Sequence, residues 1–242
     1  MLGRRAVSCA FLAAATVPMV APPAPSFADA PALLRTVAYA DLEPVKPTSK
    51  RLILVRHGET LPNRLGLPQG RYLDVGLDDV GHRQAAAAGR AFAQGPPIAV
   101  VGSSRRLRAM QTADAICQAR APARVREGPR EDLDEVEGLV PPTEVTRAYV
   151  DTRMRAFGAL VQIQRALQPG EAGVWVTHSR FLRVVLAAAA AEEAKAKGSE
   201  FLEEWKQSFP PGFDLSNAGI SCIDVSEGGV FSIRCVNAEA LG

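Results

Sequence analysis

The chain has 242 residues, enough for one substantial domain or two small ones. Apolar residues make up 47% and charged residues 22%, which is typical of a soluble globular protein. The formal net charge of +2 is close to balance and argues against a protein that binds nucleic acid by bulk electrostatics. An anion-binding site in this chain must therefore depend on the local placement of arginines.

Residues 1–28 have the pattern of a signal peptide. Arg4 and Arg5 form a basic start, an apolar stretch follows, and small residues at Ser26 and Ala28 suit a signal peptidase. We expect cleavage after Ala28 and export to the periplasm or the cell exterior, with the export route left open because the arginine pair also weakly matches a twin-arginine signal. The alternative is an uncleaved anchor, but the apolar stretch is short and broken by a proline, so we expect no stable membrane anchor after cleavage.

The rest of the chain divides into a linker and one domain. Residues 29–50 contain three prolines and little periodicity, which favours a tether or a loosely packed arm. We expect the folded domain to span residues 51–242. The sequence contains no internal repeat.

From Arg51 onwards, short apolar runs alternate with segments that have helical patterns. The expected strands are residues 52–55, 98–101, 123–126 and 174–176. The expected helices are residues 77–94, 105–120, 143–167 and 181–197. A hairpin of residues 220–225 and 230–236 completes the sheet. This alternation predicts an α/β fold of three layers, with a mostly parallel mixed sheet and helices on both faces.

The C-terminal hairpin contains two of the four cysteines, Cys222 and Cys235. If Gly228 and Gly229 form a two-residue turn, the two cysteines lie directly opposite each other at a position where side chains approach closely. In an oxidising compartment this pair could form a cross-strand disulfide, and two unbridged thiols fit the pattern equally well.

Histidines and arginines follow the ends of three expected strands. Arg56 and His57 directly follow the first strand, Arg108 lies about a turn beyond the end of the second, and His178 follows the fourth. Ligands of open α/β sheets bind outside the carboxyl ends of the strands. We therefore expect two imidazoles and two guanidiniums to gather around one phosphate group.

Three of these segments resemble the signature of the histidine phosphatase superfamily, which includes the phosphoglycerate mutases: Leu54–Thr60, Ser103–Ala113 and Val176–His178. The similarity continues through Asn63, Gln69–Arg71, Asp74–Leu77, Gly81–Ala85 and Asn217–Ile220. It covers nearly all of residues 51–236. The resemblance implies a phosphoglycerate mutase-like fold and a phosphate-transferring site.

The resemblance also implies roles for individual residues. His57 is expected to be the nucleophile, with Arg56, Arg108 and His178 around the phosphate, because a neutral imidazole nitrogen can hold a phosphoryl group covalently. Arginine supplies a permanent charge and a planar fork that matches the phosphoryl oxygens. Further candidates for substrate contacts are Asn63, Gln69, Gly70, Thr60, Thr177 and Arg180. We expect no metal and no other cofactor, since the arginines and His178 take the role that a magnesium ion would otherwise fill.

A leaving alkoxide needs a proton, and members of the family carry a carboxylic acid for this purpose on a Leu-x-Glu segment before a glycine. Glu135 fits this pattern through Leu133, and Glu131 fits if Glu137 begins the later Glu-Gly-Leu element. We favour Glu135. The other carboxylates of this segment are expected to lie on a solvated loop: Glu127, Asp132, Asp134 and Glu137.

Two departures from the family pattern bear on the substrate. Ser179 and Arg180 follow His178, where the family commonly has glycine, and Arg180 would favour an anionic or multiply phosphorylated ligand. The long insertion of the glycolytic mutases is absent, which favours hydrolysis over return of the phosphoryl group.

The sequence therefore predicts a metal-independent phosphatase of the histidine acid phosphatase type. It would hydrolyse a small phosphomonoester through a phosphohistidine on His57. The alternatives are a catalytically silent member that binds a phosphorylated ligand and a phosphoglycerate mutase-type phosphotransferase, the latter in conflict with the export signal. The sequence leaves the natural substrate and the oligomeric state open.

Overall fold

The computed structural model describes residues 39–70, 72–119, 125–136, 147–209, 213 and 215–238. The predicted signal peptide, Arg71 and the Glu137–Leu139 element lie outside these residues. Among the described helices, none combines the length and apolar character needed to cross a membrane.

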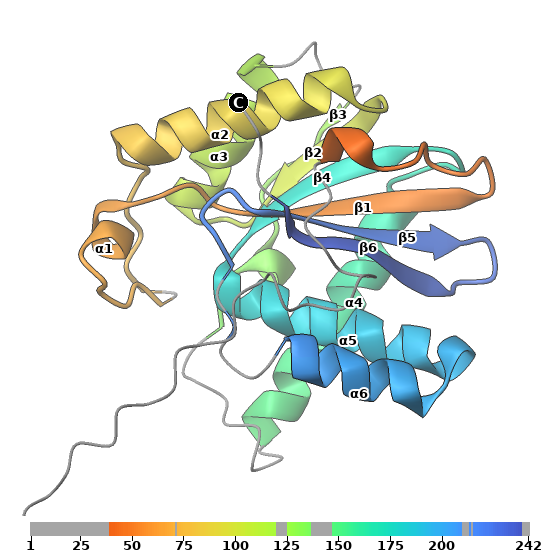
Figure 1. Ribbon diagram of the computed structural model, residues 1–242. Helices are drawn as coiled ribbons and strands as arrows, with labels where there is room; N and C mark the ends of the chain where they lie inside the picture. The colour runs from red at the N-terminus through yellow and green to blue at the C-terminus, as the bar shows by residue number, and fades with distance from the viewer. Residues whose placement is uncertain are drawn as a thin grey trace, which may run out of the picture.

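A six-stranded sheet forms the centre of the molecule, in the order β3-β2-β4-β1-β5-β6 (Figure 1). The strands are β1 (Ser49–Arg56), β2 (Ile98–Ser103), β3 (Val125–Arg126), β4 (Ala172–Thr177), β5 (Ile220–Ser226) and β6 (Phe231–Ala238). The first four strands pair in parallel, β5 is antiparallel to β1, and β6 is antiparallel to β5. The predicted mostly parallel mixed sheet is confirmed.

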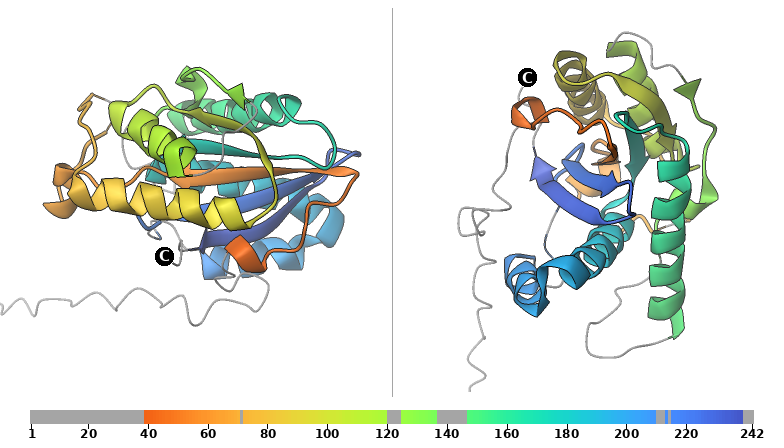
Figure 2. Two further views of the ribbon diagram at one scale, coloured as in Figure 1. Left: turned by 90° about the horizontal axis from the view of Figure 1, so that it is seen from above. Right: turned by 90° about the vertical axis from the view of Figure 1, so that its right-hand side faces the viewer.

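Helices cover both faces of the sheet (Figures 1 and 2). On one face lie η3 (Tyr39–Asp41), α2 (Asp79–Gln94) and α3 (Leu107–Ala119), and on the other lie η4 (Glu131–Leu133), α4 (Arg147–Arg165), α5 (Ser179–Lys197) and α6 (Ser199–Ser208). A short helix, α1 (Leu61–Arg64), follows β1 at the edge of the sheet. The three-layer prediction is thus confirmed as well.

The central strand β1 is buried on both faces, which explains why its sequence is an unbroken apolar run. Leu52 and Leu54 point into the core on the α4–α5 side, and Ile53 and Val55 point into the core on the α2–α3 side. Strand β1 therefore joins the two cores and fixes the position of the residues that follow it.

The packed part of the chain begins earlier than the expected start at Arg51. Tyr39 is 1% exposed and meets the ring of Phe92 edge-on at 4.9 Å between centroids. The carbonyl of Glu43 accepts a hydrogen bond from the buried side chain of Arg51. Residues 39–48 are therefore part of the domain rather than a loose arm, because one buried aromatic anchors a stretch that has no regular periodicity.

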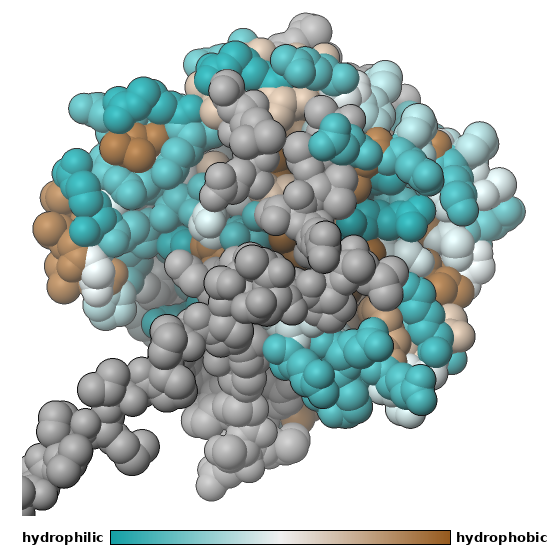
Figure 3. Space-filling model, in the orientation of Figure 1, coloured by the Kyte–Doolittle hydropathy of each residue, from teal (hydrophilic) through white to brown (hydrophobic). Residues whose placement is uncertain are grey.

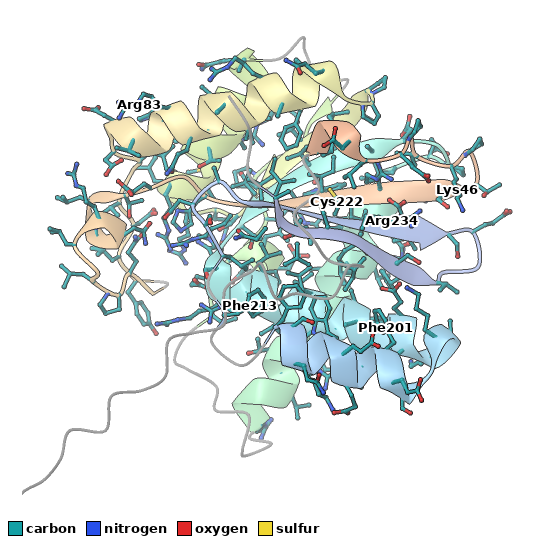
Figure 4. The ribbon with its side chains drawn as sticks, viewed as in Figure 1. Lys46, Arg83, Phe201, Phe213, Cys222 and Arg234 are labelled. Atoms are coloured by element: carbon teal, nitrogen blue, oxygen red, sulfur yellow. The ribbon has the colours of Figure 1, made fainter. Side chains whose placement is uncertain are left out.

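Helix α6 is a second element that the sequence analysis did not predict. It begins after Gly198, whose φ of 97° ends α5 and turns the chain. Trp205 from α6 is buried and lies 4.4 Å from Phe209 between ring centroids. Phe213 extends this aromatic cluster below the sheet, where Figure 4 labels it.

The C-terminal hairpin pairs Cys222 with Cys235 as predicted, although the predicted two-residue turn is wrong. The turn has three residues, 227–229, with Gly229 at a φ of 76°, a geometry that favours glycine. An irregularity between Cys222 and Ile223 then shifts the register by one residue and restores the pairing. Both cysteines are buried free thiols in this structure, and Cys222 lies within the sheet (Figure 4).

Two glycines bring the segment after β1 against the start of α2. A methyl group on Gly58 would lie 2.5 Å from the Gly81 carbonyl oxygen, and one on Gly81 would overlap the carbonyl of Glu59. The amide of Glu59 donates to the Gln84 side chain at 2.8 Å, and its carbonyl accepts from the amide of Asp78 at 3.0 Å. This close approach holds the backbone on both sides of position 58 in one place.

We expect Gly81→Ala to destabilise the protein by about 1–3 kcal/mol, the usual cost of an extra methyl in a tightly packed contact. Urea unfolding would measure this change. Gly158→Ala is the matched control, because a methyl there meets nothing within 4 Å on α4 and should stabilise the helix by about 0.5–1 kcal/mol. Equal stability of Gly81→Ala and the parent protein would contradict the role of the close approach.

Candidate active site

The ends of β1, β2 and β4 lie side by side at the edge of the sheet nearest α1 (Figure 1). The amide of His57 donates to the Thr177 carbonyl, and the amide of Ser104 donates to the Val176 carbonyl, both at 2.9 Å. This backbone pairing brings together the two histidines, which are far apart in sequence. The ring centroids of His57 and His178 are 5.2 Å apart.

His57 is held in one orientation by its own backbone neighbour. Its Nδ1 lies 2.8 Å from the carbonyl oxygen of Gly58. Because a carbonyl can only accept, the ring carries its proton on Nδ1 and keeps a lone pair on Nε2. The ring is 4% exposed. This is the tautomer that a nucleophile attacking through Nε2 requires.

Arg108 reaches the same site from the first turn of α3. It is 1% exposed, and its two terminal nitrogens donate to the carbonyls of Leu73 and Gly70, each at 3.0 Å. Its Nε is buried and has no partner among the described residues. The half-buried Arg56 donates to the carbonyl of Leu215. Both predicted arginines therefore lie beside His57, each tied to backbone carbonyls.

Burial, followed by the positive charges of Arg108 and Arg56, holds the pKa of His57 well below its ordinary value of 6.5. The pKa of His178 is also well below 6.5, because of burial, then the neighbouring His57 and the guanidinium of Arg108. At neutral pH and in the absence of an anion, each imidazole is therefore neutral and carries a single proton. A negatively charged ligand between them would offset the positive charges that crowd the site.

The structure separates the two candidates for the acid. Glu135 is 8% exposed, and its Oε1 accepts hydrogen bonds from the amides of Val136 and Phe181, both at 3.0 Å. Its charge also acts on Arg108. Glu131, in contrast, has a side chain that is 69% exposed and forms an ion pair with Arg105 at 3.0 Å. The geometry therefore favours Glu135.

Asp134 corrects the expectation of a solvated loop. Its residue is fully buried, and its carboxylate accepts hydrogen bonds from Ser104, Arg105 and Arg106. The periodicity of a short acidic segment gives no sign of this, because the partners belong to a distant loop. That loop joins the segment through a bridge between Ser104 and Arg130.

Several residues expected to contact substrate are engaged within the protein instead. The Thr60 hydroxyl donates to Asn63 Oδ1 at 3.0 Å and accepts from the side chain of Gln69. The carbonyl of Gly70 binds Arg108, and the hydroxyl of Thr177 donates to the Leu133 carbonyl at 2.7 Å. These residues support the segments that carry Asn63, Arg108 and Glu135. Their direct contact with substrate stays a prediction.

Arg180 lies on the first turn of α5, two residues after His178. It is half-buried and makes no hydrogen bond or ion pair with the described residues. Arg180 thus stays a candidate for a substrate contact.

The sequence analysis missed two residues that hold the site together. The Thr112 hydroxyl accepts from the amide of Gly58 at 3.0 Å and donates to the Arg108 carbonyl at 2.7 Å. Asn217 donates to the His57 carbonyl at 3.2 Å and to Asn63 at 3.1 Å. Both stand in the segments that carry the family resemblance, which was the available signal.

The surface beside the site is apolar over α1 and the segment after it. Leu61, Leu65 and Leu67 are 50%, 59% and 55% exposed, and brown atoms mark this region at the left of Figure 3. Within the described residues, no cluster of three or more His, Cys, Asp or Glu side chains could hold a metal ion.

Residues 52–151 match the sequence profile of the histidine phosphatase superfamily, branch 1. The match covers 100 of the 242 residues of the chain. The match includes the strand that precedes His57, both arginine-bearing segments and the segment that carries Glu135. The resemblance to this superfamily that the sequence motifs indicate is thus confirmed for these residues.

Two curated relatives are phosphatases by name. A 65-residue segment is 49% identical to fructose-2,6-bisphosphatase TIGAR B of Danio rerio and covers 27% of this chain and 25% of that protein. A 67-residue segment is 42% identical to glucosyl-3-phosphoglycerate phosphatase of Mycolicibacterium vanbaalenii and covers 28% of this chain and 29% of that protein. The matched segments therefore span only about a quarter of these relatives.

The fold of the chain is similar to that of a solved phosphoglycerate mutase from Bacillus anthracis. The two structures superpose with a TM-score of 0.62 over 79% of this chain and 94% of that chain, at 15% sequence identity. The likeness establishes the phosphoglycerate mutase-like fold.

The depressed pKa values of His57 and His178 predict how stability depends on pH. Below about pH 6.5 the unfolded chain takes up protons at both histidines, whereas the folded protein does not. The free energy of unfolding should therefore fall as the pH falls from about 7 to about 5, by up to about 1.4 kcal/mol per pH unit for each histidine. Urea unfolding across this range would measure the slope.

His57→Gln should reduce this slope, since one of the two buried imidazoles is removed. His82→Gln is the control, because His82 is exposed on α2 and takes no part in the site. A slope that changes equally in both variants would contradict the assignment.

Proposed function

We propose that this protein is a metal-independent phosphatase that hydrolyses a small phosphomonoester through a phosphohistidine on His57. The observation that carries the proposal is the state of the two buried imidazoles. His57 keeps a lone pair on Nε2, and His178 lies 5.2 Å away between ring centroids, both among guanidinium groups. A neutral nucleophile surrounded by positive charge suits the attack on an anionic phosphorus centre.

In the first step, Nε2 of His57 attacks phosphorus in line with the leaving oxygen. A bond forms between Nε2 and phosphorus as the bond from phosphorus to the ester oxygen breaks. The proton stays on Nδ1, and its hydrogen bond to the Gly58 carbonyl stabilises the positive charge that develops on the ring. The backbone contact thus orients the nucleophile and supports its phosphorylated form.

Glu135 supplies the proton that the departing alkoxide needs. Because two backbone amides donate to Oε1, the proton belongs on Oε2 of this side chain. In the second step, the Glu135 carboxylate takes a proton from a water molecule that attacks the phosphohistidine. The bond between Nε2 and phosphorus breaks, inorganic phosphate leaves, and both His57 and Glu135 return to their starting states.

Arg56 and Arg108 hold the oxygens of the transferring group. Arg108 already donates through its terminal nitrogens to two carbonyls, and these hydrogen bonds fix the plane of its guanidinium. Its buried Nε–H, which has no partner among the described residues, is left to bind a phosphoryl oxygen. A rigid guanidinium loses little entropy when it binds the phosphoryl group. This positive charge supplies the electrostatic stabilisation that a divalent ion provides in other phosphoryl-transfer enzymes.

The named relatives act on small phosphorylated compounds, as their names state. We extend that substrate class, and no particular member of it, to this protein. The half-buried guanidinium of Arg180 favours a substrate with a second anionic group.

The direct test is transfer of label from a radioactive aryl phosphate to the protein, quenched in alkaline detergent, where phosphohistidine survives. We expect label on His57 and metal-independent release of inorganic phosphate. His57→Gln should lose both, with turnover reduced more than about 1000-fold, and His82→Gln should keep both. Label without release of phosphate would indicate a phosphotransferase, and the absence of both would indicate a silent binding protein. Turnover that survives in His57→Gln would overturn the mechanism.

The role of Glu135 can be tested against Glu131 as its matched control. Glu135→Gln should lower kcat by about 100- to 10,000-fold for an alkyl phosphate, whose leaving group needs a proton. The loss of kcat/KM, which reports only the first step, should be much smaller for 4-nitrophenyl phosphate, whose leaving group needs no proton. Glu131→Gln should leave both rates within about twofold, since that side chain faces solvent. The reverse pattern would make Glu131 the acid.

A further inference from the structure

Asp134, Ser104 and His178 form a continuous chain of hydrogen bonds behind the proposed active site. Ser104 Oγ lies 2.8 Å from Asp134 Oδ1 and 2.8 Å from His178 Nε2. All three residues are fully buried. Asp134 makes no direct hydrogen bond to His178 or His57, so its hydrogen-bonded connection to His178 passes through the serine.

The number of protons that each group carries determines the direction of each hydrogen bond. The pKa of Asp134 would be raised by burial, but hydrogen bonds from Ser104 and Arg105 lower it below its usual value, so the group is a carboxylate. A carboxylate can only accept, and a serine hydroxyl has a single proton. Ser104 therefore donates to Asp134, and its oxygen accepts from the amide of Arg106 at 3.2 Å and from Nε2–H of His178.

The same reasoning assigns the state of His178. Its neutral ring carries the proton on Nε2 and a lone pair on Nδ1, and Nδ1 is buried with no partner among the described residues. Two carboxylates lie on the neighbouring segment: Asp134 reaches the ring through Ser104, and Glu135 accepts a hydrogen bond from the amide of Phe181. The groups that lower the pKa of the ring most, after burial, are His57, Arg108, Arg106 and Arg155. All of these oppose a second proton on the ring unless an anion is bound.

We propose that Asp134 is a positioning residue: acting through Ser104, it keeps the proton of His178 on Nε2, so that Nδ1 receives a proton from a monoanionic phosphoester. The second half of this proposal rests on the proposed function. The first half concerns only the protein.

The proton transfer is balanced. The O–H bond of the substrate's monoanionic phosphate breaks, and an N–H bond forms at Nδ1 of His178. The products are a dianionic phosphate group and an imidazolium, which donates its new proton back to a phosphate oxygen as a charge-assisted hydrogen bond. The net charge of the complex does not change. The imidazolium of His178 is an additional cation beside the dianionic phosphate group that forms with it.

The requirement for a monoanion sets the pH dependence. A phosphomonoester loses its second proton near pH 6. Above this pH, kcat/KM should fall about tenfold per pH unit, because the binding species becomes scarce. Without the carboxylate, the Ser104 hydroxyl can turn and donate to Nε2, which moves the ring proton to Nδ1. That tautomer would bind the dianion directly, and the decline should become much shallower.

Nitrogen-15 NMR of the unliganded full-length protein tests the first half without any assay of activity. The chain has only three histidines, and long-range correlations from the ring C–H protons report which nitrogen carries the proton. We expect Nε2–H for His178 in the parent protein and a shift to Nδ1–H in Asp134→Ala. Ser104→Ala, which removes the acceptor, should lose the strong preference for Nε2–H, and it serves as the second variant if Asp134→Ala does not fold.

Arg105→Ala is the matched control. The side chain of Arg105 binds the same carboxylate through its Nε and Nη2, at 3.1 and 2.9 Å, but makes no hydrogen bond to the Ser104 hydroxyl. If the cluster has only a structural role, Arg105→Ala and Asp134→Ala should change the His178 ring alike. The proposal predicts that His178 keeps its proton on Nε2 in Arg105→Ala but not in Asp134→Ala. An Nδ1–H ring in the parent protein, or the same ring state in both variants, would overturn it.

The pH profile of kcat/KM with 4-nitrophenyl phosphate tests the second half. Above about pH 6, kcat/KM should fall about tenfold per pH unit in the parent protein and in Arg105→Ala. In Asp134→Ala it should fall by no more than about twofold per pH unit. Parallel profiles in all three proteins would refute uptake of the substrate proton by His178. Absence of turnover in every protein, with the NMR result intact, would instead count against the proposed function alone.

Discussion

Two imidazoles buried among guanidinium groups cannot hold a second proton until an anion binds, and this constraint organises the rest of the site. The Gly58 carbonyl, which can only accept, places the proton of His57 on Nδ1. The Ser104 hydroxyl, whose own proton goes to Asp134, accepts from Nε2 of His178. Burial and the charge of Arg108 lower the pKa of both rings, with Arg56 adding to the effect on His57 and the neighbouring His57 to the effect on His178. The site is thus prepared for an anion by backbone and side-chain hydrogen bonds that exist before any ligand arrives.

The location of the site was predictable from local sequence because it depends on strand ends. Apolar runs mark β1, β2 and β4, and the polar residues that follow parallel strands must meet at one edge of the sheet. His57, Arg108 and His178 could therefore be placed together from the sequence. The hairpin pairing of Cys222 with Cys235 was also predictable, although a three-residue turn and a bulge cancel each other to produce it.

The roles of other residues depend on contacts between segments distant in sequence, which periodicity does not reveal. In the sequence, Asp134 resembles its solvated neighbours. In the fold, the loop after β2 places Ser104 and two arginines against it. Tyr39 becomes part of the core only because α2 presents Phe92 to it. Glu131 and Glu135 stand four residues apart in an acidic segment, and only the turn of η4 sends one outward and the other inward.

The hydrogen bonds from Arg108 to the carbonyls of Leu73 and Gly70 have an evolutionary consequence. These carbonyls belong to the surface segment after α1, the kind of segment that changes most readily when an enzyme adapts to a new ligand. Here the backbone of that segment also sets the plane of a guanidinium beside the reactive ring. Insertions or deletions in it would disturb selectivity and turnover together. Divergence of this protein toward new ligands should therefore proceed by side-chain replacement at a constant loop length.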